Sequence, residues 1–266
     1  MARVRPAAVA GHLYPRDATT LAETVDRLLA TAADPTAPVA PVKALIAPHG
    51  SYADSGAMAA LAYAALLPAR DIITRVVLLG PTHRVAIDGL AVPGADLFAT
   101  PLGQVPVARL SDEVLTALPQ VHISPAAHVA EHSLEVQLPF LQRVLGEFEL
   151  IPLAVGRAAP AVVAEVMDAL WGGPETVVVV SSNLSHYHPY AVARRLDEAT
   201  ARHLLALQPD IRHVQACGAA PVNGLLVSAR AHRLRPRLLD QCNSGDAAGG
   251  RERVVGYASL AFDSIA

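Results

Sequence analysis

Four short apolar runs along the chain have the length and composition of buried β-strands. They are VKALIAP (42–48), RVVLLGP (75–81), LIPLAVG (150–156) and TVVVVSS (176–182), and each ends in loop residues. Continuous runs of Val, Ile and Leu are typical of strands that are buried on both faces of a sheet. We therefore expect these four segments to form the centre of one sheet.

Segments with Ala, Leu and charged residues at helical spacing separate and follow these runs. They predict helices at 17–33, 54–67, 131–146, 160–171, 190–207 and 221–233. Strands that alternate with helices indicate a largely parallel sheet with helices on both faces. The expected fold class is therefore α/β, with a central, largely parallel sheet flanked by helices.

Two regions depart from this alternation. Strands are expected near 235–242 and 253–262, and the second of these would add to the sheet in a mixed or antiparallel manner. The segment 84–110 is rich in Pro and Gly and is expected to hold small strands. The sheet should therefore be mixed at its margins.

Composition and charge limit the classes of function. The chain has 266 residues, 52% of them hydrophobic and 17% charged, so we expect one globular domain over residues 1–266. The net charge of -3 and the lack of a dense basic run argue against a nucleic-acid or anionic-membrane surface. No signal-peptide pattern or run of 18 apolar residues occurs, which predicts a cytoplasmic protein. The expected partner is a small-molecule substrate or a peptide.

Histidines follow three of the predicted strands. His49 follows the first run, His83 follows the second, and SSNLSHYH after the fourth run supplies His186 and His188. In open α/β sheets, ligands bind beyond the carboxyl ends of the strands. A single histidine there is more often a loop cap, but three favour a catalytic or sensing site for zinc, copper or iron.

The two cysteines, Cys217 and Cys242, have different contexts. Cys217 precedes a predicted helix in which Pro221 suits the first turn, and a helix N-terminus lowers the pKa of a nearby thiol. Cys217 is therefore either a reactive or metal-binding thiolate or a small packed residue. Cys242 is expected to be a packed residue, and no disulfide framework is expected.

The segment EHSLEVQLPFL (131–141) carries charge at the start of a predicted helix. Helical spacing would place Glu131 and Glu135 on one face, and Glu131 or His132 could support the metal pocket. The alternative is acidic charge that the helix dipole favours. Histidines without strand-end context are taken as surface or core residues, namely His12, His122, His203, His213 and His232, while His128 is left open.

Seven motifs in order make the chain resemble the Memo-like family, also labelled AmmeMemoRadiSam system protein B. They are AGHLYP, IAPHGSYADSG, LLGPTHR, EHSLEVQLPFLQ, SSNLSHYHPY, CGAAPVNGLL and VVGYAS. The resemblance implies the fold of the class III extradiol dioxygenases, which use non-haem Fe(II) and dioxygen to cleave catecholic rings. It also implies that His49, His83 and Cys217 bind one metal ion, with Fe(II) expected first and copper or zinc as alternatives.

The resemblance further guides the choice of pocket residues. Asn183 and His186 fall where the family has an aspartate and a histidine, so His186, Asn183 and His132 are candidates for catalytic groups. His186 rather than His188 is expected to face the pocket. Candidates for substrate binding are Ser51, Tyr52 and Glu131. Because Asn183 replaces a carboxylate, an acid/base role at that position is in doubt.

Three functions are compatible with these residues. The first is an iron-dependent, dioxygenase-like oxidoreductase acting on an unidentified small molecule, with His186 as acid or base. The second is a redox protein that binds iron or copper without turnover. The third is a module that binds a peptide or protein in the former active-site pocket.

Overall fold

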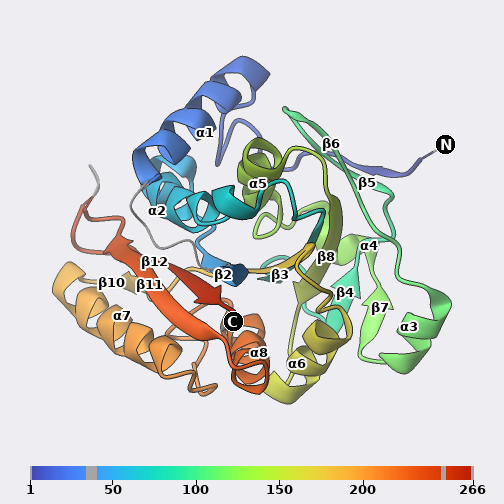
Figure 1. Cartoon of the computed structure of the whole chain (residues 1–266). Helices are drawn as coiled ribbons and strands as arrows, with labels where there is room; N and C mark the ends of the chain where they lie inside the picture. The colour runs from blue at the N-terminus through green and yellow to red at the C-terminus, as the bar shows by residue number, and fades with distance from the viewer. Residues whose placement is uncertain (1, 34–40, 247–249, 265–266) are drawn as a thin grey trace.

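The four apolar runs form adjacent parallel strands in the computed structural model, which describes residues 2–33, 41–246 and 250–264 (Figure 1). Their order across the sheet is β2 (Val42–Ala47), β9 (Thr176–Ser181), β3 (Arg75–Pro81) and β8 (Glu149–Val155). Each neighbouring pair is parallel, so all four carboxyl ends lie at the same edge of the sheet. The prediction of these four strands is confirmed.

Both faces of these strands are buried. In β9, Val177 and Val179 pack into the core on one face, while Val178 and Val180 pack into the core on the other. Successive side chains of a strand point to opposite faces, so a strand covered on both sides needs apolar residues at every position. This explains why the central strands have continuous apolar sequences.

Antiparallel and shorter strands complete the sheets. On one side β12 (Val254–Asp263) pairs antiparallel with β2, β10 (His186–His188) and β11 (Arg235–Asn243). On the other side β4 (Leu90–Val92) pairs antiparallel with β8 and parallel with β7 (Val121–Ile123). A separate sheet contains β1 (Val4–Arg5), β5 (Leu97–Thr100) and β6 (Gly103–Pro106). The mixed sheet and the small strands within 84–110 are both as predicted.

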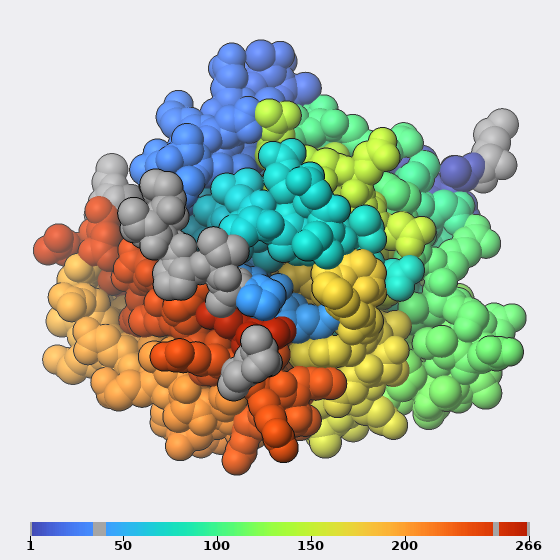
Figure 2. All heavy atoms as spheres, in the orientation of Figure 1, coloured from blue at the N-terminus to red at the C-terminus, as the bar shows by residue number. Residues whose placement is uncertain are grey.

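Helices cover both faces of the main sheet. One layer contains α1 (Ala18–Ala32), α2 (Tyr52–Ala64) and α5 (Leu138–Leu145), and the other contains α6 (Pro160–Ala169), α7 (Tyr190–Leu205) and α8 (Ala219–Ala231) (Figure 1). In the space-filling view of Figure 2, drawn in the same orientation, the N-terminal residues lie at the top in blue and residues of the C-terminal third lie at the bottom in orange. Short helices occur at Leu67–Ala69, Asp112–Ala117 (α3), Pro125–Val129 (α4) and Glu135–Gln137. Within the described ranges, every helix is too short or too polar to cross a membrane.

The predicted helix at 131–146 is wrong in its first part. Residues 131–134 are not helical, a 3-10 turn covers Glu135–Gln137, and α5 begins only at Leu138. The Glu131 carboxylate accepts the backbone N–H groups of His132 and Ser133, which competes with helix formation. As a result Glu131 and Glu135 do not share a helical face but join separate networks.

A buried ion pair fixes the N-terminal segment against residues 128–135. Arg5, 5% exposed, pairs with the fully buried Glu135 and also donates to the carbonyl oxygens of His128 and Glu131. Glu135 accepts in addition from the Tyr14 hydroxyl at 2.5 Å and from two backbone N–H groups of the N-terminal segment. Because Arg5 and Glu135 are both hydrogen-bonded to the groups around them, this charge pair can remain away from water.

Arg5→Met is expected to destabilise the protein by about 3–5 kcal/mol, because it leaves the Glu135 carboxylate buried without its counter-charge. Chemical denaturation would measure the free energy of unfolding. The matched control is Arg143→Met, since Arg143 pairs with Asp26 where both side chains are partly exposed. The control substitution should lower the free energy of unfolding by less than about 1 kcal/mol. Equal losses in the two variants would contradict the structural role of the buried pair.

Candidate metal centre

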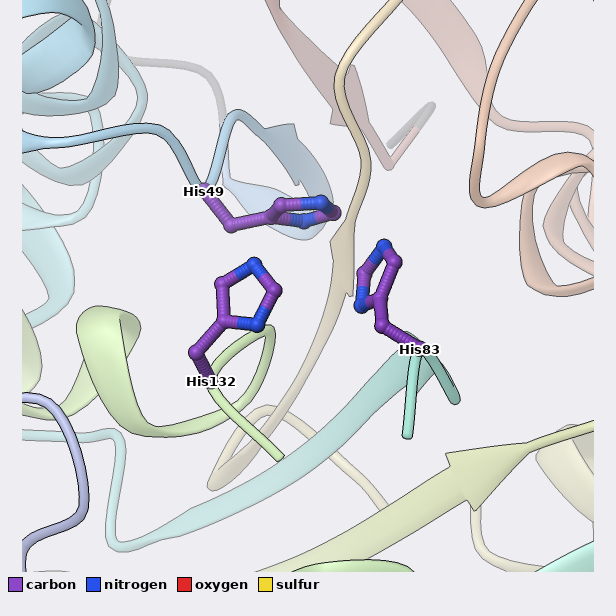
Figure 3. Close-up of side chains that lie close together, drawn as sticks. All are labelled: His49, His83 and His132. Carbon is purple, nitrogen blue, oxygen red and sulfur yellow. The ribbon is translucent and has the colours of Figure 1, made fainter. Parts of the chain in front are cut away.

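Three imidazoles converge at the carboxyl edge of the sheet (Figure 3). His49 follows β2 and His83 follows β3, two strands separated only by β9, while His132 comes from the non-helical segment before α5. One ligand atom from each ring lies within 4.8 Å of those of the other two. His49, His83 and His132 could therefore hold a metal ion together.

Cys217 lies against this group, directly before the N-cap of α8. Its Sγ atom is 3.2 Å from Nε2 of His49. The N-cap Gly218 donates its N–H to Ser182 Oγ at 3.0 Å, and an added Cβ would lie 2.7 Å from that oxygen, so glycine allows this close approach. Burial raises the pKa of the Cys217 thiol, but the imidazoles of His49 and His83 outweigh burial and hold it well below its usual value. The thiolate form is favoured.

A buried hydrogen-bond network fixes the tautomer of His49. Gln137 Nε2 donates to the carbonyl of Pro48 at 2.9 Å and to Ser181 Oγ at 2.8 Å. Ser181 in turn donates its only hydroxyl proton to the carbonyl of Ser133 at 2.6 Å. Ser181 Oγ can therefore only accept from His49 Nδ1, which lies 2.9 Å away. Nδ1 of His49 thus carries a proton, and Nε2 is the ring nitrogen that lies at the cluster.

The carboxylate of Glu131 orients the other two histidines. It accepts from the backbone N–H of His83 at 2.5 Å, from His83 Nδ1 at 2.9 Å, and from the N–H groups of His132 and Ser133 at 2.9 Å each. Burial raises the pKa of Glu131, but the hydrogen bonds and charge of His83 outweigh burial and lower it to about 2. An ionised carboxylate therefore holds Nδ1–H of His83, which leaves Nε2 as the ring nitrogen that a metal would bind.

The protonation properties of the donors suit a metal cation. Burial lowers the pKa of His132 to about 4, with a further contribution from His49, so this ring is neutral at physiological pH. Burial also lowers the pKa of His83, but hydrogen bonds with Cys217 and Glu131 outweigh burial and raise it to about 9. The neighbours of His83 thus favour positive charge at this position, and a metal cation would also supply such charge. Imidazole nitrogens and a thiolate are ligands for zinc, copper and iron.

The cluster forms one wall of a cavity of about 570 Å³. Pockets of roughly 300–1,000 Å³ are typical of small-molecule sites. Besides the four donor residues, the lining includes Asn183, His186, Tyr187, His188, His213 and Tyr257. Both His186 and His188 line the cavity, so the expectation that His188 is excluded from it is wrong.

Asn183 and His186 lie at this cavity with different surroundings. Asn183 is 6% exposed, and its Oδ1 accepts the backbone N–H of His49 at 2.8 Å, which fixes the position of that histidine. His186 is partly buried, and burial lowers its pKa. A neutral His186 can accept a proton from a molecule bound in the cavity.

The three residues proposed for substrate binding do not line this cavity. Ser51 caps α2, donating to Asp54 Oδ2 at 2.6 Å. The Tyr52 hydroxyl donates to the carbonyl of Val136 at 2.7 Å, and its ring packs on Phe140 within the core. The Glu131 carboxylate is directed to His83 and His132. The geometry therefore supports structural roles for all three residues.

Sequence reasoning missed several residues around the site. Ser181 and Gln137 form the network behind His49; they lie within the motifs SSNLSHYHPY and EHSLEVQLPFLQ, but neither is among the predicted site residues. His213 is among the histidines expected to be surface or core residues; it is exposed, yet it lines the cavity. Its place four residues before Cys217 is the signal that could have identified it. His128, left open, is a core residue that donates Nε2–H to the carbonyl of Ala91 at 2.8 Å.

Comparisons with known proteins agree with this geometry. A family model described as Memo-like protein matches residues 5–261. A MEMO1 family protein of Aquifex aeolicus is 32% identical over 272 residues, covering 98% of this chain and 99% of the relative. One of Metallosphaera sedula is 33% identical over 234 residues, covering 82% of each chain.

A solved structure shares the fold. The structure described as uncharacterized protein JW3007 from Escherichia coli K12 aligns with a TM-score of 0.52 and 15% identity, covering 83% of this chain and 99% of that chain. At this identity the likeness concerns the fold alone. The single α/β domain with its mixed sheet is consistent with the extradiol dioxygenase-like fold that the motifs imply.

Glu131→Gln is expected to weaken Zn(II) binding by about 10–100-fold, because an amide replaces the ionised acceptor that orients His83 and His132. Competition with a chromophoric chelator would measure the affinity, and circular dichroism would check the fold. Glu149→Gln is the matched control, since Glu149 is exposed and pairs with Arg75 at the surface. Unchanged affinity in the Glu131 variant would mean that this carboxylate does not support a metal centre.

Proposed function

Because the chain belongs to the Memo-like family, we propose that it is a metal-dependent, dioxygenase-like oxidoreductase that acts on a small molecule. The observation that carries this proposal is the convergence of three imidazoles and a thiol at the wall of one cavity. Donors clustered at a cavity wall leave room for a substrate beside the metal, as catalytic sites require. Fe(II) is the first candidate for the metal, with copper or zinc as alternatives.

We assign the metal ligands to His49, His83 and Cys217. Nε2 is the ligand atom of both histidines, because Nδ1 of each donates to Ser181 or Glu131. The thiolate of Cys217 supplies the negative charge that a carboxylate supplies in the common 2-His-1-carboxylate iron sites. His132, whose ring is neutral, is either a further ligand or a contact to the bound substrate.

The remaining cavity residues position and protonate the substrate in this proposal. When bound, the metal would supply the redox chemistry that allows dioxygen to react with an organic molecule. His186 accepts a proton from the substrate or returns it, because burial keeps its imidazole neutral. Asn183 holds the backbone of His49 and, as an amide, takes no part in proton transfer.

Two other functions are outcomes of the same experiment. Metal content would first be determined after anaerobic loading, and oxygen uptake would then be followed with catechols and other small molecules. Metal-dependent oxygen consumption supports the oxidoreductase. Tight metal binding without turnover would instead favour a redox protein, and binding of a peptide without any metal would favour a recognition module. A cytoplasmic location stays a prediction.

Cys217→Ser is expected to abolish the thiolate-to-metal charge-transfer absorption of the Co(II)-loaded protein. His49 and His83 would still hold the ion, although more weakly, because a neutral hydroxyl replaces the anionic ligand. The matched control is Cys242→Ser, since burial, together with Asp246 and Asp240, raises the pKa of Cys242 to about 11, which keeps that thiol protonated. If the Co(II)-loaded wild-type protein showed no such band, Cys217 would not be a ligand, and the third ligand would be His132 instead.

His186→Ala is expected to reduce metal-dependent oxygen uptake by about 10²–10⁴-fold, the usual contribution of a general acid or base. Metal content should stay the same because the donor atoms are unchanged. His188→Ala is the control, as His188 lies on the same strand and lines the same cavity. If the His186 variant lost bound metal to the same extent as it lost oxygen uptake, His186 would be a metal ligand rather than a proton carrier.

A further inference from the structure

A second cavity, of about 750 Å³, lies beside the metal cluster at the carboxyl ends of β3 and β8. Small or apolar residues form most of its lining. They are Pro81, Thr82, Ala86, Ile87, Val155, Gly156, Ala158, Ala159, Ala219, Ala220 and Pro221, joined by Arg157, His213 and Cys217. We call this cavity the apolar groove. Its volume alone is within the range of roughly 300–1,000 Å³ that small-molecule sites have.

The groove adjoins the metal cavity, and the two cavities share lining residues. Cys217 and His213 line both cavities, and Thr82 in the groove precedes His83 in the cluster. The groove therefore begins at the residues that border the metal cluster.

One wall of the groove is held rigidly. Gly156 donates to the carbonyl of Gly89 at 3.0 Å, and Arg157 donates to the carbonyl of Ile87 at 2.9 Å. A Cβ atom at Gly156 would lie 2.1 Å from the Ile87 carbonyl oxygen, so only glycine permits this contact. The wall is therefore already formed before a ligand binds, which limits the entropic cost of binding.

The charge around the groove favours an uncharged occupant. Arg157 is the one Lys, Arg, Asp or Glu residue among these lining residues, all of which the structure describes. Its guanidinium pairs with Asp88 at 2.9 Å, and both side chains are largely exposed, at 88% and 76%. The charge thus lies at the rim and is directed to solvent, while the walls present alkyl groups.

We propose that the apolar groove binds an uncharged hydrocarbon extension of the substrate, whose polar head lies at the metal cluster. This inference rests on the proposed function and names the substrate class for the same site. The substrate is accordingly an amphipathic small molecule, with a metal-binding head and an apolar tail. Each methylene of the tail that is buried against these walls strengthens binding, because apolar surface is removed from water.

A series of n-alkyl hydroxamates tests the proposal, because the hydroxamate binds metal ions while the chain length varies from acetohydroxamate to octanohydroxamate. Affinities would be measured by calorimetry on Zn(II)-loaded and on metal-free protein, since zinc is redox-inert. We expect affinity to rise about fourfold for each methylene that enters the groove, which corresponds to about 0.8 kcal/mol. Replacing hexanohydroxamate with 6-aminohexanohydroxamate should remove this gain.

Two variants fill the groove from exposed positions. Ala159→Phe and Ala86→Phe should leave acetohydroxamate affinity unchanged and flatten the dependence on chain length. The control is Ala57→Phe, at an exposed position of α2 that lines neither cavity. Two positions are used so that misfolding of one variant does not prevent the comparison.

The two proposals can fail separately in this experiment. The dependence on chain length reports the groove, whereas the difference between Zn(II)-loaded and metal-free protein reports the metal cluster. Affinity that does not change with chain length, or a gain that survives in both groove variants, would overturn the apolar-tail assignment. Equal affinities with and without zinc would count against the metal centre. The change of affinity with chain length would still show whether the groove binds the alkyl tail.

Discussion

The site depends on one buried carboxylate, that of Glu131. This side chain is 1% exposed and is surrounded by N–H donors from two separate segments, the loop after β3 and residues 132–133. A carboxylate in such a position is stable only when it is fully hydrogen-bonded. Residues 131–134 therefore leave the helical path, and this departure brings the His132 ring beside His83. A single buried charge thus orients one imidazole and places another.

The order of the central strands provides the rest of the geometry. Because β9 lies between β2 and β3, Ser181 at its end lies directly behind His49, while the following residues supply Asn183 and His186. Ser181 and Gln137 are both fully buried. In a region of low dielectric, each hydrogen bond is stronger and each missing partner more costly. The network therefore keeps Nε2 of His49 directed at the cluster with little freedom to rotate.

The sequence predicted the central fold well because burial on both faces leaves an unambiguous apolar pattern, as in 176–182. It also predicted that His49 and His83 meet, since both follow parallel strands. It could not predict the break at 131–134, because that break depends on a tertiary contact of Glu131 with His83. Nor could it identify Ser181 and Gln137, since a polar residue in an apolar segment has no local signature of its partner. His213 was missed because its position relative to the cavity comes from the chain path before α8.

The charge of the metal-ligand set depends on whether Cys217 is ionised, and the residue at position 183 affects that ionisation. Three neutral imidazoles would give a neutral set, whereas a thiolate with two imidazoles carries one negative charge, as the common non-haem iron triad does. Cys217 Sγ lies 3.8 Å from the backbone carbonyl oxygen of Asn183, and both residues line the cavity. An aspartate at position 183 would place a second anion there, and neighbouring like charges raise each other's pKa. The amide retains the contact to the His49 backbone without that repulsion, so the neutral residue favours an ionised Cys217.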